Sequence, residues 1–193
     1  MTGPARIADS AMYAHLWGTS EARAVFGEQA RLQGWLDVLA ALARAQAAYG
    51  LVPQAAADDI TAHARVDLLD LGVVAEQTRA SGHSTLGLVR ALRDVLPADV
   101  HPYVHLGASV QDLTDTWTAT ALRTVTSLVR RDLLRLEDLL LTLAVRHRNT
   151  LQAGRTHGQP GAPLTFGWKA ASWADELRRH CDRLDEGSAR WLV

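Results

Sequence analysis

The sequence predicts an all-α protein whose longest helix belongs to an extended helical bundle. Apolar residues recur at steps of three and four along most of the chain, which is the period of helices with one buried face. One such run continues from residue 110 to 147, and no stretch shows the alternation typical of a strand. These observations together favour helices throughout.

The first expected helix spans residues 22–49. Gly50 and Pro53 follow it and are ordinary stop signals. Its apolar residues predict one buried stripe made of Leu32, Trp35, Leu36, Leu39, Leu42 and Ala43. Shorter helices are expected at 53–64, 68–79 and 84–96, separated by Ser81-Gly82 and ended by Pro97.

The longest expected helix spans residues 110–147, roughly 55 Å at about 1.5 Å per residue. Its apolar positions include Leu113, Trp117, Leu122, Val125, Val129, Leu133, Leu136, Leu140 and Leu143. A helix of this length needs partners along its whole length, which favours an extended bundle. A last helix is expected at 164–183.

Composition narrows the possible functions. The 193 residues carry a net charge of −1, so no basic footprint for nucleic acid is visible. No apolar run approaches the ~20 residues of a membrane span, and the first residues lack the apolar segment of a signal peptide. The single cysteine, Cys181, excludes an internal disulfide and fits a reducing compartment.

Three short polar stretches interrupt the helical pattern, and each contains histidine. They read SGHSTLGLVRAL with His83, HLGASVQDLTDT with His105, and GRTHGQPGAPLTFG with His157. No nucleotide-binding glycine loop, no GxSxG motif and no metal-ligand motif occurs, so neither a metal nor a cofactor is expected.

In the second stretch, Ser109 followed by Asp112 resembles a capping box and predicts that the long helix starts at Ser109. A helix start can bind a carboxylate or phosphate, or can be a plain cap with nothing bound. In the third stretch, Pro160 and Pro163 exclude a continuous helix, so His157 is expected in a loop that leads into the last helix. Histidine suits proton transfer near neutral pH, although a loop histidine can also be purely structural.

Together the three stretches resemble motifs of the fumarase/aspartase superfamily, in its branch of adenylosuccinate lyase and 3-carboxy-cis,cis-muconate cycloisomerase. HLGASVQDLTDT is similar to the HxGxTSxDxxDT region, and GRTHGQ is similar to the GRTHxQ region. The segment at 25–53 is similar to the first long helix of that branch. The resemblance covers nearly the whole chain.

The resemblance implies an N-terminal helical domain at 1–104 and the first part of a central helical-bundle domain at 105–193, which looks truncated. It also implies a cytoplasmic homotetramer, with active sites where chains meet. The chain ends on Trp191-Leu192-Val193, which indicates either a terminus tucked into a core or a piece of a longer protein. The superfamily's third region, GSSxMPxKxNP, holds its serine base and does not occur in these residues, which favours the second interpretation.

The implied reaction is β-elimination from a small dicarboxylate substrate, with release of fumarate. The resemblance makes His157 the general acid and His83 an assisting catalytic residue that contacts the substrate. It assigns substrate binding to Ser109, Thr156, Gln159, Ser84 and His105. Without the serine base, this chain by itself is expected to be inactive.

At two positions the sequence departs from the motifs of the superfamily, so more than one function is considered. Val110 replaces the serine of the superfamily's Thr-Ser pair, and Ser84 replaces an aspartate that follows the histidine in adenylosuccinate lyases. The chain is therefore predicted to be part of an adenylosuccinate lyase-like enzyme or, alternatively, of a muconate cycloisomerase. A third possibility is a truncated helical module that only associates and catalyses nothing.

Overall fold

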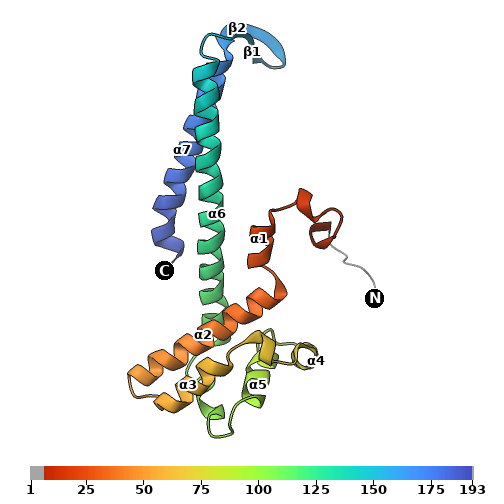
Figure 1. Ribbon diagram of the computed structural model, residues 1–193, viewed down its shortest axis with the longest axis vertical. Helices are drawn as coiled ribbons and strands as arrows, with labels where there is room; N and C mark the ends of the chain where they lie inside the picture. Colours follow the sequence, from red (N-terminus) through yellow and green to blue (C-terminus); the bar gives the residue numbers. More distant parts are fainter. Residues whose placement is uncertain (1–6, 193) are drawn as a thin grey trace. The chain divides into compact units, whose positions relative to one another are not determined.

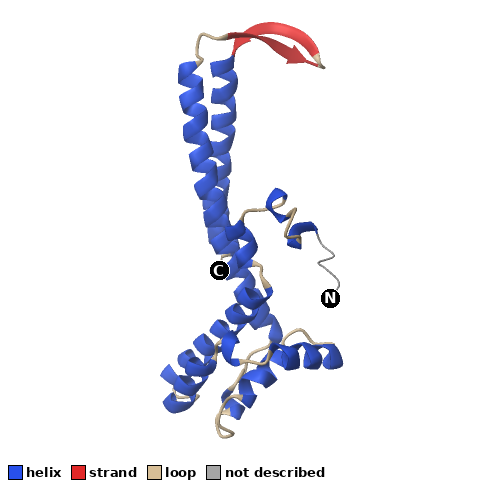
Figure 2. Ribbon diagram, turned by 45° about the vertical axis from the view of Figure 1, so that its right-hand side comes forward, coloured by secondary structure: helices blue, strands red, loops and turns tan. Residues whose placement is uncertain are grey.

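The computed structural model describes residues 7–192 and is built mostly of helices (Figures 1 and 2). The chain divides into two compact units, Met1–Ala121 and Leu122–Val193, and the division falls within one long helix. Each unit has its own packing and is described separately below. The prediction of an all-α fold is confirmed, apart from one small hairpin.

Unit 1 is a cluster of short helices arranged around one longer helix. Its elements, in chain order, are η1 (Ile7–Asp9), η2 (Ala14–Leu16), α1 (Ser20–Val25), α2 (Glu28–Ala48), α3 (Gln54–His63), η3 (Val66–Leu68), α4 (Leu71–Ser81), α5 (Leu86–Asp94), η4 (His101–Tyr103) and the first turns of α6 (Val110–Arg146). The helices predicted at 53–64, 68–79 and 84–96 therefore exist, with ends displaced by a few residues. The helix predicted at 22–49 is divided into α1 and α2.

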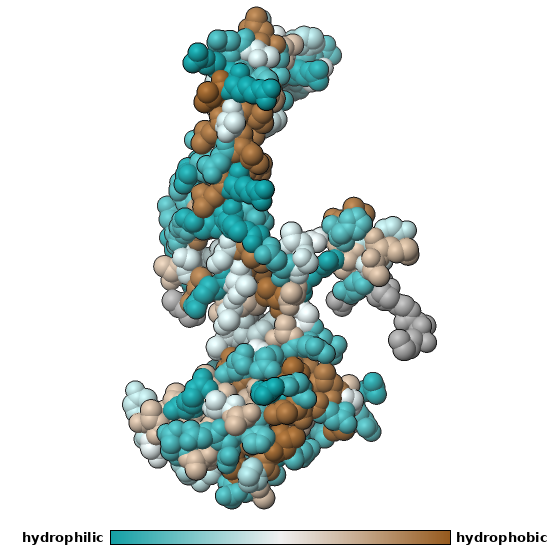
Figure 3. Space-filling view, in the orientation of Figure 1, coloured by the Kyte–Doolittle hydropathy of each residue, from teal (hydrophilic) through white to brown (hydrophobic). Residues whose placement is uncertain are grey.

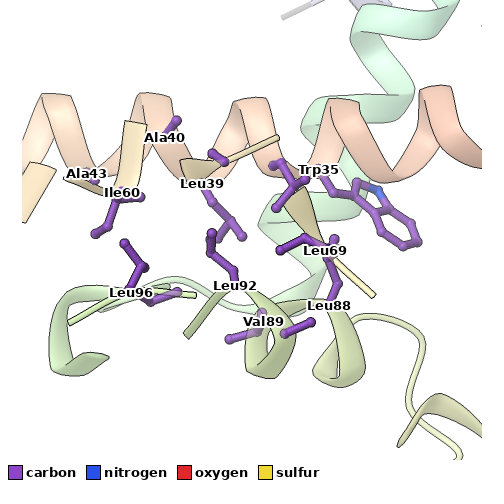
Figure 4. Packing of buried hydrophobic residues seen from close by; sticks show 14 of the residues in the cluster. Trp35, Leu39, Ala40, Ala43, Ile60, Leu69, Leu88, Val89, Leu92 and Leu96 are labelled. Carbon is purple, nitrogen blue, oxygen red and sulfur yellow. The ribbon is translucent and has the colours of Figure 1, made fainter. Parts of the chain in front are cut away.

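The core of unit 1 lies between α2 and the shorter helices. The predicted stripe on α2 is buried at every position except Leu42, which is half-buried. Figure 4 shows Leu39 and Ala43 of α2 facing Ile60 of α3 and Leu92 of α5. Because these side chains are almost completely removed from water, they supply the main hydrophobic stabilisation of the unit.

Local hydrogen bonds explain where α4 begins and ends. The Asp70 side chain accepts hydrogen bonds from the backbone N–H groups of Gly72 and Val73, so it is the N-cap of α4. At the other end, Gly82 adopts a left-handed φ of +65°, which terminates the helix. The predicted break at Ser81-Gly82 is thus confirmed, and it brings His83 to the start of the following turn.

Trp117 ties the first turns of α6 to the core of unit 1. Its ring makes edge-to-face contacts with Phe26 and Trp35, with centroids 6.4 and 6.3 Å apart. The guanidinium of Arg31 lies over the same ring, 5.1 Å from its centroid. These contacts hold the helix that begins at the predicted Ser109 cap in a defined place within the unit.

Unit 2 consists of the remainder of α6 and an antiparallel partner, α7 (Phe166–Trp191), with a hairpin between them (Figures 1 and 2). Arg130 makes a two-pronged ion pair with Asp185, and Arg178 pairs with the buried carboxylate of Glu137 at 2.7 Å. Small residues on α7, among them Ala174 and Cys181, are buried within this unit. The last helix runs beyond its predicted end at 183 and reaches Trp191.

The hairpin consists of β1 (Leu151–Thr156) and β2 (Gln159–Thr165), paired antiparallel with an irregularity between Ala153 and Arg155. The expectation of helices throughout was therefore wrong at this point. His157 lies in a turn outside the helices, as predicted, but this turn joins two strands, and β2 follows it before α7 begins. Both strands are edge strands, which tolerate the prolines that argued against pairing. Most of their residues are exposed, so the hairpin has no buried face that would produce an alternating pattern.

Several large apolar side chains of α6 remain exposed within unit 2. They are Leu122, Val129, Leu136, Leu139, Leu141 and Val145. Figure 3 shows hydrophobic side chains among hydrophilic ones on the surface of the α6–α7 pair. None of the helices within 7–192 is both long and apolar enough to cross a membrane.

Candidate active site

The seven predicted site residues fall into two groups. Unit 1 contains His83, Ser84, His105 and Ser109, whereas unit 2 contains Thr156, His157 and Gln159. Most of the residues lie at turns or at a helix start, whereas Thr156 and Gln159 are the end residues of the strands β1 and β2. All are exposed except His105, which is half-buried, so their side chains are accessible to a ligand.

His83 lies in the turn between α4 and α5, and both its backbone and its ring form hydrogen bonds. Its backbone N–H donates to Oγ of Ser81 at 3.2 Å. Its ring nitrogen Nδ1 accepts hydrogen bonds from the backbone N–H groups of Thr85 and Leu86, at 3.4 and 3.3 Å. The imidazole thus caps the start of α5, a role usually taken by Ser, Thr, Asp or Asn.

Ser84 lies beside a cavity of about 360 Å³ in unit 1. Apolar residues of α2 and α4 form much of its wall, and two guanidinium groups, those of Arg31 and Arg79, also line it. Arg79 has no acidic partner among the residues that the structure describes. The carboxylate of Glu28 lines the cavity as well, so it offers an apolar space with charged groups of both signs beside a predicted substrate-binding residue.

His105 and Ser109 bracket the turn that leads into α6. His105 has a left-handed φ of +63°, which is uncommon for a residue with a side chain. Its Nε2 lies 3.3 Å from the carbonyl oxygen of Ser109, and since a carbonyl only accepts, Nε2 is the donor. This bond closes the turn and leaves Nδ1 as the ring nitrogen without a partner in the described chain.

The predicted capping box at the start of α6 is confirmed. The backbone N–H of Asp112 donates to Oγ of Ser109 at 3.2 Å, and the backbone N–H of Ser109 donates to Oδ2 of Asp112 at 2.7 Å. Hydrogen bonding to the carboxyl by the Ser109 backbone N–H and by the Ser109 hydroxyl, together with the nearby His105, holds the pKa of Asp112 below its usual value. The Asp112 carboxylate therefore places a negative charge at the helix start where an anion was expected.

The hairpin of unit 2 brings Thr156, His157 and Gln159 together. Thr156 and Gln159 are the last facing pair of the two strands, and His157 and Gly158 form the turn between them. Both turn residues have positive φ, at +49° and +72°, which is the combination found in type I′ hairpin turns. The three side chains are exposed at the tip, and none has a hydrogen-bond partner among the residues described.

Arg155 is a further candidate that the sequence-based list omitted. It precedes Thr156 in the hairpin, is exposed, and has no ion-pair partner within residues 7–192. A guanidinium next to a histidine suits an anionic ligand, and the motif GRTHGQ already contained this signal.

Two other kinds of site find no support in the part of the chain that the structure describes. No group of three or more His, Cys, Asp or Glu side chains within residues 7–192 could hold a metal ion. Cys181 is buried between α6 and α7, as expected for a packing residue rather than a nucleophile.

Comparisons with known proteins agree on one family. A family model described as lyase matches residues 17–193. The adenylosuccinate lyase of Methanothermobacter thermautotrophicus is 40% identical over 177 residues, which cover 92% of this chain and 39% of that protein. The 3-carboxy-cis,cis-muconate cycloisomerase of Pseudomonas aeruginosa is 44% identical over 174 residues, covering 89% and 38%.

A solved structure shows the same fold. The 3-carboxy-cis,cis-muconate lactonizing enzyme from Pseudomonas putida superposes with a TM-score of 0.90 at 38% identity, over 95% of this chain and 43% of that one. The chain thus spans about two fifths of the length of the relatives it matches.

Proposed function

The chain belongs to the lyase family, and on that premise we propose that it corresponds to the N-terminal portion of an adenylosuccinate lyase-like enzyme. The proposed reaction is β-elimination from a small dicarboxylate substrate with release of fumarate. A base removes the proton next to a carboxylate, and an acid protonates the group that departs from the neighbouring carbon. One observation carries this proposal: a two-residue hairpin turn presents the exposed ring of His157 between Thr156 and Gln159, and no side-chain hydrogen bond to this ring is found within residues 7–192.

His157 is proposed as the general acid. A positioned acid must present its proton to the leaving group, so its ring has to be accessible and its backbone fixed. The two-residue turn fixes the backbone of His157, and the exposed ring is available to a ligand. Thr156 and Gln159 lie on either side, and we propose that they orient the substrate through hydrogen bonds. Arg155 adds positive charge to this hairpin and suits an anionic substrate.

Unit 1 is proposed to bind the rest of the substrate. Ser109 lies at the start of α6, where backbone N–H groups and the helix dipole favour a carboxylate. The Asp112 carboxylate opposes an anion at this point, so an anion bound there has to overcome the repulsion of a like charge. We propose that His83, His105 and Ser84 also contact the substrate, with His83 assisting His157.

Assembly is part of the proposal. Because α6 leaves a series of large apolar side chains exposed within unit 2, we propose that copies of the chain associate through it as a homotetramer in the cytoplasm. A chain that spans two fifths of its relatives and does not contain the serine-base motif is proposed to be inactive alone.

A muconate cycloisomerase is the second candidate function. It is favoured by the 44% identity to the Pseudomonas aeruginosa enzyme and by the TM-score of 0.90 to the Pseudomonas putida structure. Ser84, which stands where adenylosuccinate lyases carry aspartate, also favours it. The geometry of the hairpin favours neither candidate over the other.

The deciding experiment is an assay of the product of the complete gene, read through the codon for Val193, on adenylosuccinate and on 3-carboxy-cis,cis-muconate. Release of fumarate from adenylosuccinate supports the first candidate, and lactone formation or opening supports the second. A gene without any GSSxMPxKxNP region, whose product associates but converts neither substrate, would favour a helical module that only associates.

A further inference from the structure

The ring of His83 caps the start of α5, and this role determines which ring nitrogen can carry hydrogen. Nδ1 accepts the backbone N–H groups of both Thr85 and Leu86. Thr85 is completely buried, so its N–H has no access to water and depends on this acceptor. The first turn of α5 is therefore capped only while Nδ1 is unprotonated. This helix carries the core residues Leu88 and Leu92.

This arrangement fixes which nitrogen of the neutral ring carries hydrogen. A neutral imidazole has one N–H donor and one acceptor nitrogen. Since Nδ1 is the acceptor for two backbone donors, the hydrogen is on Nε2. A protonated ring has N–H on both nitrogens, and its Nδ1–H would then point at two other N–H groups. Protonation would consequently release the cap of α5.

We propose that His83 acts in the reaction as a neutral hydrogen-bond donor, through Nε2–H, to a carboxylate oxygen of the substrate, and that it transfers no proton. This inference rests on the proposed elimination and makes His157 the only proton donor of the pair. Nε2 of His83 is suited to this task because the ring is exposed and Nε2 has no partner among the residues described. Like a side-chain amide, His83 would donate a hydrogen bond to the substrate without giving up its proton.

The first test measures the tautomer directly and does not depend on activity. Long-range ¹H–¹⁵N spectra of the 193-residue chain at a pH where the rings are neutral report which ring nitrogen carries hydrogen. The His83 signals are identified as those lost in His83→Asn, with His15→Asn as the control from an exposed histidine without a recorded contact. The proposal expects hydrogen on Nε2 of His83. Hydrogen on Nδ1, or a mixture of both forms, would overturn it.

The second test separates the two nitrogens by substitution. The side-chain oxygen of Asn can occupy the position of Nδ1 and cap α5, but Asn has no group at the position of Nε2. His83→Asn should therefore leave the unfolding temperature of the chain unchanged. His83→Ala removes the capping acceptor and should lower the unfolding temperature by about 2–4 °C. Equal losses in both variants would contradict the capping role.

In the complete enzyme, His83→Asn should raise KM at least tenfold while kcat changes by less than about tenfold, because only a binding contact is lost. A kcat lowered by roughly 10²–10⁴-fold with KM unchanged would instead identify a proton-transfer group and overturn the proposal. If the wild-type product has no elimination activity, the proposed function fails, and the tautomer measurement still decides the state of His83.

Discussion

Gly34 of α2 and Trp117 of α6 pack in direct contact within unit 1. A Cβ atom added to Gly34 would lie only 2.7 Å from Nε1 of Trp117, and closer still to Cδ1. The absent side chain lets the five-membered ring of Trp117 approach α2, while the same indole makes edge-to-face contacts with Phe26 and Trp35. This contact anchors the helix start at Ser109 to the core of its unit.

We predict that Gly34→Ala destabilises the chain by about 1–3 kcal/mol, because the ring of Trp117 has to move out of a packed position. Alanine alone would favour the helix by roughly 0.5–1 kcal/mol, so the two effects have opposite signs. The free energy of unfolding, measured with urea, reports the sum of these two contributions. The control is Gly34→Ala in a Trp117→Ala background, where the substitution should be neutral or stabilising. A loss of the same size in both backgrounds would show that the close contact is not the cause.

Ser109→Ala is predicted to cost about 1 kcal/mol of stability, the usual value of an N-cap. The backbone N–H of Ser109 contributes most to the lowered pKa of Asp112 and stays in the variant, but the contribution of the Ser109 hydroxyl is lost, so this pKa should rise. NMR titration of the Asp112 carboxyl in both proteins measures the change. An unchanged pKa would mean that the Ser109 hydroxyl does not lower the pKa of Asp112.

Acid should weaken the same capping box. Because the pKa of Asp112 is lowered in the folded chain, its contribution to stability is complete above the unfolded pKa of about 3.9 and is lost as pH falls through the folded value. Asp112→Asn should abolish this part of the acid dependence while keeping an acceptor for the Ser109 N–H. Unfolding curves of both proteins between neutral pH and pH 2 provide the comparison, and identical pH profiles would contradict the prediction.

The chain is predicted to self-associate through α6. Leu122, Val129 and Leu136 recur at intervals of seven residues and are 40%, 45% and 46% exposed, so they form an apolar stripe along the helix. Burying each such side chain contributes about 1.5–3 kcal/mol. Light scattering should detect oligomers at micromolar concentration.

Val129→Glu with Leu136→Glu should weaken this association by placing charges in the stripe. Ser127→Glu is the matched control, since it adds a charge on an exposed position of the same helix outside the stripe. A folded wild-type monomer at micromolar concentration would contradict the prediction, as would equal effects of the stripe and control variants.

The sequence predicted the helices well where their signals were local. The start of α6 was placed correctly because Ser109 and Asp112 form a recognisable box, and the stripe on α2 followed from its spacing. Membership of the family was also readable, since the three polar stretches stood in the expected order. These features depend on residues close together in the chain.

The hairpin could not be predicted in the same way. Its strands have little buried surface, and glycine and proline interrupt them, so neither alternation nor propensity pointed to pairing. The turn at His157-Gly158 uses positive φ at a histidine, where asparagine is the commoner signal. The capping role of His83 was equally hidden, because histidine is not among the usual N-cap residues.

The most direct test of the account is the turnover of His157→Asn in the product of the complete gene. Asparagine adopts the positive φ of this turn readily, so the hairpin and the unfolding temperature should be preserved while the acid is removed. The account predicts that fumarate release from adenylosuccinate falls roughly 10²–10⁴-fold, with substrate binding less affected. Near-normal turnover in this variant would contradict the assignment of His157 as the general acid.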